Sequence, residues 1–182
     1  NAYGEVNAGW SIDPTGKIFT GIVNVNFGIL PYIGLNNQSI TLMRVYGGSG
    51  VVFAIQYAKT SIPVGVFRIS DSEHAASAAG TTTVLASTWY EVKAVIDATL
   101  GSESVTLYVD GVQEAQNLAV GAFTRPITAL RFGAFLATGV PTIGVQFDVD
   151  DISFSAGRVG SGVGPQGTGA FGRIGNTQIG IP

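Results

Sequence analysis

The sequence contains no cysteine and few charged residues. Without cysteine, no disulfide can hold the fold and no thiolate can bind a metal or act as a nucleophile. Charged residues make up 12% of the 182 residues, about half of the roughly 25% that is usual in globular proteins. The formal net charge is −3, and because nucleic-acid binding needs a basic surface, we expect no nucleic-acid partner. No apolar run approaches the length of about 18 residues that a membrane-spanning helix needs, so we expect no membrane partner.

Residues 89–115 carry the clearest structural signal. Every second residue is apolar between Tyr90 and Ile96, and the same alternation returns between Val105 and Val109. A period of two is typical of strands with one buried face. The following pair, Asp110-Gly111, tolerates the positive φ angles of a type I′ turn. The stretch therefore predicts a β-meander with its register fixed at this turn, and with Trp89 in or near the core.

The rest of the chain repeats this strand pattern. Further strands are predicted at residues 17–27, 40–46, 51–57, 64–69, 82–86, 127–136 and 145–154, whereas residues 73–79 fit one helical turn. The apolar phase slips by one at Asp150-Asp151, which predicts a β-bulge there. About ten short strands with little helical periodicity predict an all-β fold, a two-sheet antiparallel β-sandwich of the jelly-roll type.

Two segments resemble a known family. The run Leu107-Tyr108-Val109-Asp110-Gly111, after a strand opened by Trp89, and the run from Phe147 to Phe154 are similar to strands of laminin-G-like, concanavalin A-like domains. The resemblance implies one such domain over residues 1–156. It leaves the function open, because this architecture serves lectins, glycosidases, adhesion modules and virion proteins.

The composition changes at residue 157. Residues 157–182 hold nine glycines and no acidic residue, which predicts an extended Gly-rich C-terminal arm rather than a packed domain. Glycine permits close approach to another backbone, so the arm is predicted to dock on a partner by strand addition. The arginines would pair with carboxylates and the apolar side chains would fill pockets. The predicted partner-binding residues are Arg158, Val159, Phe171, Arg173, Ile174, Ile179 and Ile181.

The sequence indicates no catalytic site. Glycosidases related to the resembled family use a Glu-x-Asp-x-x-Glu set on one strand, and this chain has none. The single histidine, His74, has no triad or metal-ligand spacing around it and is interpreted as a solvated loop residue. On these grounds we expect the protein not to be an enzyme and to need no cofactor.

Two further sites remain as alternatives to plain structural roles. Asp148, Asp150 and Asp151 form the densest carboxylate group, and oxygen ligands so close together suit calcium. Alternatively, these carboxylates accept hydrogen bonds from backbone amides at the bulge.

Polar side chains on residues 17–27 give the second alternative. Thr20, Asn24 and Asn26, joined by Gln56 from another strand, could hydrogen-bond a sugar ring. Trp10, Tyr32 or Tyr46 nearby could stack on the same ring. Otherwise they belong to an ordinary solvated sheet face.

These observations lead to one expectation and one alternative. The expectation is a non-catalytic structural protein that decorates a large particle, such as a phage head or tail or an extracellular filament. It would be a homo-oligomer anchored through its arm to other subunits, in a virion or outside the cell. The alternative is a carbohydrate-binding, lectin-like module of a secreted or surface protein.

Overall fold

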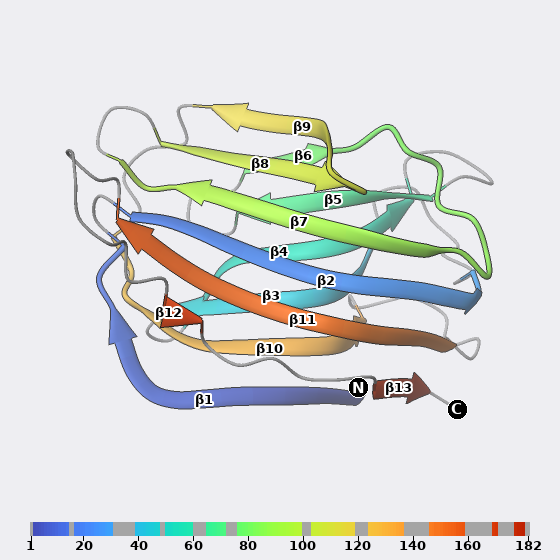
Figure 1. Cartoon of the computed structure of the whole chain (residues 1–182), viewed down its shortest axis with the longest axis horizontal. Helices are drawn as coiled ribbons and strands as arrows, with labels where there is room; N and C mark the ends of the chain where they lie inside the picture. Colours follow the sequence, from blue (N-terminus) through green and yellow to red (C-terminus); the bar gives the residue numbers. More distant parts are fainter. Residues whose placement is uncertain are drawn as a thin grey trace.

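A computed structural model describes residues 2–14, 17–30, 39–47, 50–59, 65–71, 76–99, 103–118, 124–136, 146–158, 169–170 and 177–180. In these ranges every regular element is a strand, and the strands form two antiparallel sheets that pack face to face (Figure 1). No membrane-spanning helix is found in the described part of the chain. The predicted fold class, a two-sheet antiparallel β-sandwich of the jelly-roll type, is therefore confirmed.

Sheet A, the rear sheet in Figure 1, has six strands. In spatial order these are β1 (Ala2–Ile12), β10 (Ile127–Leu136), β3 (Ser39–Gly47), β4 (Gly50–Lys59), β5 (Gly65–Asp71) and β6 (Ala76–Ala79). Sheet B lies in front. Its order is β12 (Gly169–Ala170), β11 (Gln146–Arg158), β2 (Lys17–Ile29), β7 (Trp89–Asp97), β8 (Ser104–Val109) and β9 (Val112–Leu118), and β13 (Thr177–Gly180) also pairs with β11.

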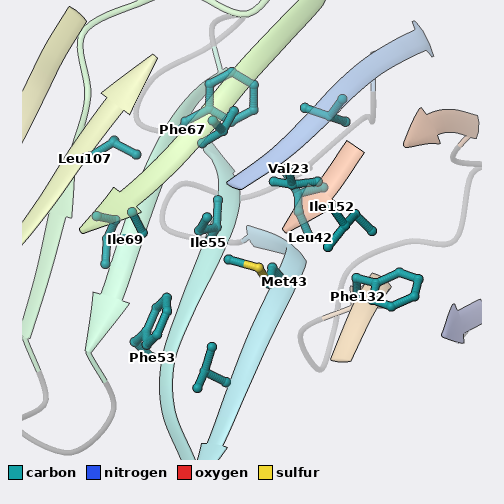
Figure 2. Close-up of a cluster of buried hydrophobic side chains, with 14 of the residues drawn as sticks. Val23, Leu42, Met43, Phe53, Ile55, Phe67, Ile69, Leu107, Phe132 and Ile152 are labelled. Atoms are coloured by element: carbon teal, nitrogen blue, oxygen red, sulfur yellow. The ribbon is translucent and has the colours of Figure 1, made fainter. Parts of the chain in front are cut away.

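The core lies between the two sheets and is built by strand alternation (Figure 2). Phe27 of sheet B meets Tyr57 of sheet A with ring centroids 5.0 Å apart, and Phe67 meets Tyr90 at 5.5 Å. Burial of each such side chain stabilises the fold by about 1.5–3 kcal/mol. The sandwich is thus held by side chains that interdigitate from both inner faces.

One glycine allows this close packing. Gly21 of β2 faces Met43 of β3, and a Cβ at Gly21 would collide with the Met43 side chain. Figure 2 shows Met43 among the buried side chains that fill the space between the sheets. A larger residue at position 21 would therefore displace Met43 from the core.

The predicted hairpin is confirmed. Asp110 and Gly111 have φ angles of 50° and 78°, and β8 and β9 pair on either side of them. The Asp110 side chain also accepts a hydrogen bond of 2.9 Å from the Glu91 amide, while the Asp110 amide donates to the Glu91 carbonyl at 2.9 Å. The turn is therefore tied to the neighbouring strand β7.

The predicted bulge is confirmed as well. The pairing of β11 with β2 shifts register between Asp150 and Ser153, and Asp151 has a φ of 46°. The Asp150 carboxylate accepts a hydrogen bond of 2.8 Å from the Asp151 amide. The bulge lets Val149 and Ile152, which are three residues apart, both face the core.

Three predictions about local structure are wrong. Residues 82–86 form no strand, because this segment carries the chain from β6 in one sheet to β7 in the other. Residues 76–79 form β6 instead of a helical turn, because pairing with the edge of β5 overrides local propensity. Trp89 is not in the core but 46% exposed, because alternation places its neighbour Tyr90 inside.

The first strand escaped the sequence analysis. No strand was predicted for residues 2–12, yet they form β1, the edge strand of sheet A beside β10. Pairing with β10, rather than an apolar pattern of its own, makes this segment a strand.

The described parts of the C-terminal arm pair with the β-sandwich of the same chain. β12 pairs with the end of β11 at Ser155 and Ala156, and β13 pairs with its start between Gln146 and Val149. Both pairings are antiparallel, so the chain turns back after β11 and covers the free edge of sheet B. Covering an edge in this way blocks uncontrolled strand addition.

The segment that connects β6 in sheet A to β7 in sheet B, called the crossing segment below, is held in place by one carboxylate. Glu114 of β9 accepts hydrogen bonds from the amides and hydroxyls of Thr81 and Thr82. Burial alone would raise the pKa of Glu114, but these hydrogen bonds, led by that from the Thr82 hydroxyl, outweigh it and lower the pKa from 4.5 to about 2. The ionised form thus holds the crossing segment.

Replacing Gly111 tests the hairpin. We expect Gly111→Val to destabilise the fold by about 1 kcal/mol or more, since a β-branched residue does not tolerate positive φ. Thermal unfolding measures the loss, with the exposed Val112→Thr as control. An unchanged Tm for Gly111→Val would show that this turn does not set the register.

Replacing Glu114 tests the crossing segment. We expect Glu114→Gln to cost about 1 kcal/mol at neutral pH, since one charge-assisted acceptor is lost in a partly solvated place. The folded-state pKa is depressed, so the stabilisation is complete above pH 4.5 and is lost as the pH falls toward about 2. The difference in Tm between wild type and variant should therefore shrink through this window. A difference that does not depend on pH would contradict this role of the ionised carboxylate, and Glu91→Gln is the control.

Candidate functional site

The outer face of sheet A gathers the chemically richest side chains of the described residues. Strand alternation sends their neighbours Val45, Ile55, Phe67 and Phe132 into the core, so the residues between these point outward. We call the outward set the sheet A face, and its members are Thr41, Arg44, Tyr46, Gln56, Arg68 and Arg131. They come from β10, β3, β4 and β5, which lie side by side in Figure 1.

A bulge in β3 brings two of these residues to the same face. Thr41 and Arg44 are three residues apart, so in a regular strand they would point to opposite sides. The pairing with β4 shifts register between Thr41 and Met43, and Leu42 and Met43 both enter the core. This extra residue turns Thr41 outward, onto the side of Arg44.

Two guanidinium groups lie beside each other on this face. Arg44 of β3 is directly opposite Arg131 of β10, and like charges in this position destabilise a sheet. Arg131 lies over the ring of Tyr46, 4.5 Å from its centroid, and its Nη1 donates a hydrogen bond to the Tyr46 hydroxyl at 3.4 Å. The arrangement concentrates positive charge around one phenol.

A hydrogen-bonded chain crosses the next row of the sheet. Arg68 Nε donates to Gln56 Oε1 at 2.9 Å, and Gln56 Nε2 donates to Thr41 Oγ1 at 3.4 Å. The three side chains hold one another in place, which fixes the direction of the Arg68 guanidinium. Burial lowers the pKa of Arg68, yet an arginine keeps its charge at any ordinary pH.

Small side chains lie on the sheet surface between the arginine–tyrosine group and the hydrogen-bonded chain. Ala54, Ala58 and Val66 point outward from β4 and β5, yet all three are buried, as is Thr41. The arginines, Tyr46 and Gln56 are half-buried. Charges in such a sheltered place act more strongly on a bound anion than charges in open water do.

The predicted calcium residues lie on the outer face of sheet B. Asp148 and Asp150 alternate with the buried Val149 on β11, and Asp151 occupies the bulge. Among the described residues, no three His, Cys, Asp or Glu side chains come close enough to hold a metal ion. The alternative role is seen for Asp150, whose carboxylate binds the Asp151 amide, and calcium binding stays a prediction without geometric support.

The other predicted site residues are separated by the fold. Asn24 and Asn26 do lie on the outer face of sheet B, as expected. Trp10 is on β1 in sheet A, so the sequence grouped residues of two different sheets. Of the predicted partner-binding residues, Arg158 is on β11 and Ile179 on β13. Val159, Phe171, Arg173, Ile174 and Ile181 lie outside the described residues, as does His74.

The sequence analysis named only Gln56 and Tyr46 of the sheet A face, grouped them with Asn24 and Asn26 of sheet B, and missed the three arginines and Thr41. The six residues of this face are spread from position 41 to position 131, and none stands in a motif. Only the strand order β10-β3-β4-β5 brings them together. A usable signal was that several strands each place one arginine or glutamine between apolar residues, as in Phe67-Arg68-Ile69 and Leu130-Arg131-Phe132.

Comparisons by sequence and by structure differ. No protein-family model and no curated protein matches the chain. Among solved structures, it is similar to a marine PL7 alginate lyase from Zobellia galactanivorans, with 15% identity and a TM-score of 0.55 over 81% of this chain and 65% of that one. It is also similar to an alginate lyase from Corynebacterium sp., with 15% identity and a TM-score of 0.54 over 81% of this chain and 62% of that one. The chain thus spans less than two thirds of either lyase.

A tetrameric galectin from the sponge Cinachyrella sp. is similar over 84% of this chain and 99% of that one, with 9% identity and a TM-score of 0.50. The chain thus shares the jelly-roll β-sandwich fold of these lyases and of the galectin. This fold is consistent with the one that the family resemblance implied.

The expected function needs correction. A non-catalytic protein that decorates a particle was predicted, but the solved structures that share the fold over most of the chain include several polysaccharide lyases and a galectin. None of these structures supports a virion or capsid role. The absence of the glycosidase carboxylate set excludes only one kind of catalysis on this fold, so it did not justify the expectation of a non-catalytic protein.

Replacing Gln56 tests the hydrogen-bonded chain. We expect Gln56→Leu to destabilise the fold by about 1–3 kcal/mol, because it leaves the half-buried Arg68 without this acceptor. The double variant Gln56→Leu/Arg68→Met should be much closer to wild type, since both partners become apolar. A double-mutant cycle from chemical unfolding measures the coupling. Additive losses would mean that the two side chains do not support each other.

Proposed function

We propose that the protein binds an acidic polysaccharide on the sheet A face and cleaves it by β-elimination. The observation that supports this proposal is the group of three arginines with one tyrosine and one glutamine, half-buried on the outer face of one sheet. The concentration is unusual in a chain with only nine Lys and Arg and a net charge of −3. A uronate polymer offers carboxylates that suit such a surface.

Elimination at a uronate requires three actions, and this face offers a group for each. A cation must neutralise the sugar carboxylate, a base must remove the proton on the adjacent carbon, and an acid must protonate the oxygen of the departing sugar. The electron pair of the broken C–H bond forms a carbon–carbon double bond as the C–O bond to the next sugar breaks. The step therefore needs no oxidant, reductant or water.

Arg44 and Arg131 are the candidates for neutralising the carboxylate, because they lie directly opposite each other. Gln56, held by Arg68 and Thr41, can donate to the same or the next carboxylate after a local shift. Tyr46 is the candidate for both proton transfers, because its hydroxyl lies beside Arg131, where the sugar carboxylate would bind. The phenol oxygen would take the proton from the sugar carbon as its own proton passes to the departing sugar oxygen.

A second candidate is binding without cleavage. The similarity to a galectin, which the chain matches over almost its whole length, favours a lectin-like protein that keeps the sugar intact. Either function implies a glycan partner and an extracellular location, since polysaccharides of this kind lie outside cells.

Assays of cleavage and of binding with alginate as the substrate distinguish the two candidate functions. For the lyase we expect new ultraviolet absorbance from the double bond formed at each cut, and we expect Tyr46→Phe to lower kcat by about 100-fold or more with little change in affinity. Arg44→Gln and Arg131→Gln should instead weaken binding by about tenfold and reduce its dependence on salt. Lys93→Gln, a lost cation on the outer face of sheet B, is the matched control.

Two results would contradict the proposal. Binding of alginate without any new absorbance would overturn the lyase and leave the lectin-like alternative. If alginate does not bind to the wild type, or if the Lys93 control weakens binding as much as the two arginine variants do, the sheet A face is not the site.

A further inference from the structure

The outer face of sheet B exposes a tryptophan that the sheet A site does not use. Trp89 is 46% exposed although it is part of a regular strand. Its outward direction is fixed, because the next residue, Tyr90, packs against Phe67 in the core and its hydroxyl accepts a hydrogen bond from the Leu85 amide. The indole is thus held on the surface by buried contacts of its neighbour.

Polar side chains continue from Trp89 across the sheet. Trp89 on β7 lies opposite Asn26 on β2, which lies opposite Asp148 on β11. Neighbouring strands are about 4.8 Å apart, so this row spans about 10 Å. Figure 1 shows β7, β2 and β11 side by side at the front of the molecule.

A second polar row runs parallel to the first. Glu91, Asn24 and Asp150 lie opposite one another on the same three strands, two residues along, and therefore about 7 Å from the first row. Hydrogen bonds fix the positions of the two residues at the ends of this row. The Glu91 backbone is bound to Asp110 at the hairpin, and the Asp150 carboxylate is bound to the Asp151 amide at the bulge.

The chemistry of the two rows is opposite to that of the sheet A face. Carboxylates and amide oxygens accept hydrogen bonds, and an indole offers a flat apolar surface. A ligand for this surface should bring hydroxyl donors and an apolar ring face, and should carry no negative charge.

From this arrangement we infer a second glycan-binding site, formed by Trp89 with Asn24, Asn26, Glu91, Asp148 and Asp150, that takes a neutral hexopyranose chain. A pyranose ring packs its C–H face on the indole and donates its hydroxyls to the carboxylates and amides. A uronate is repelled by the three carboxylates. The core separates this site from the sheet A face, so both can be occupied at once.

The test uses the full chain and named sugars. Cellohexaose and mannohexaose serve as neutral probes and hexamannuronate as the acidic probe, with affinities from calorimetry and from the change in tryptophan fluorescence. We expect the wild type to bind at least one neutral probe, and Trp89→Ala to weaken this binding by about tenfold or more. Asp148→Asn should weaken it as well, through the loss of a charged acceptor.

Matched variants show whether a loss of binding is specific to this face. Leu85→Ala removes a comparably exposed apolar side chain outside the two rows and should leave binding unchanged. Arg44→Gln should affect hexamannuronate alone. Because the neutral probes and Trp89→Ala test only this face, the result is independent of whether the sheet A face binds or cleaves a uronate.

Several outcomes would overturn the inference. These are a wild type that binds neither neutral probe, a Trp89→Ala variant that binds as well as wild type, and a loss of hexamannuronate binding on replacement of Trp89. A dimer in light scattering that Trp89→Ala dissociates would show that the face is occupied by a second copy of the chain instead.

Discussion

The central strands of this sandwich each give one face to a shared core, and the positions of their polar groups follow from that constraint. Phe19, Phe27, Phe67 and Phe154 are almost fully buried between the sheets. Because strand side chains alternate, the apolar set fixes which residues remain outside. Where alternation would misplace a residue, a bulge corrects it, as at Leu42 in β3 and at Asp151 in β11. The two outer faces are therefore consequences of core packing, and a one-residue slip in either strand would dismantle them.

What the sequence could predict was local. The Asp110-Gly111 turn and the Asp150-Asp151 bulge need only a few neighbouring residues to be recognised, and both are present. The strand β1, the exposure of Trp89 and the sheet A face depend on which strands pair. Arg44, Arg68 and Arg131 become neighbours only through the order β10-β3-β4-β5, and no spacing along the chain encodes that order. Sequence reasoning found the fold class and missed the candidate site for this one reason.

The arm shows how a local pattern can be identified correctly while its partner is not. Glycine-rich sequence does allow close backbone pairing, and β12 and β13 do pair as strands. Their partner is β11 of the same chain, which would otherwise be the free edge of sheet B. An edge strand of 13 residues is a strong template for strand addition. The intramolecular partner has a large advantage, since the chain that joins it to β11 keeps its effective concentration high.

The few charged side chains of the chain are distributed unevenly over the two outer faces of the sandwich. Three of its nine cations lie on the sheet A face, whereas Glu91, Asp148 and Asp150 lie on the outer face of sheet B. The apolar core keeps the two groups apart, so neither can neutralise the other by direct contact. Neither face carries charge of one sign only, since Glu5 of β1 lies opposite Arg131 in sheet A and Lys93 follows Glu91 along β7. The field at one face is only weakly offset by the other across a screened distance. The three arginines and the three carboxylates cancel in the net charge of −3, so the total does not reveal either surface. Under the two proposals, a neutral sugar and a uronate need not compete for the same side chains.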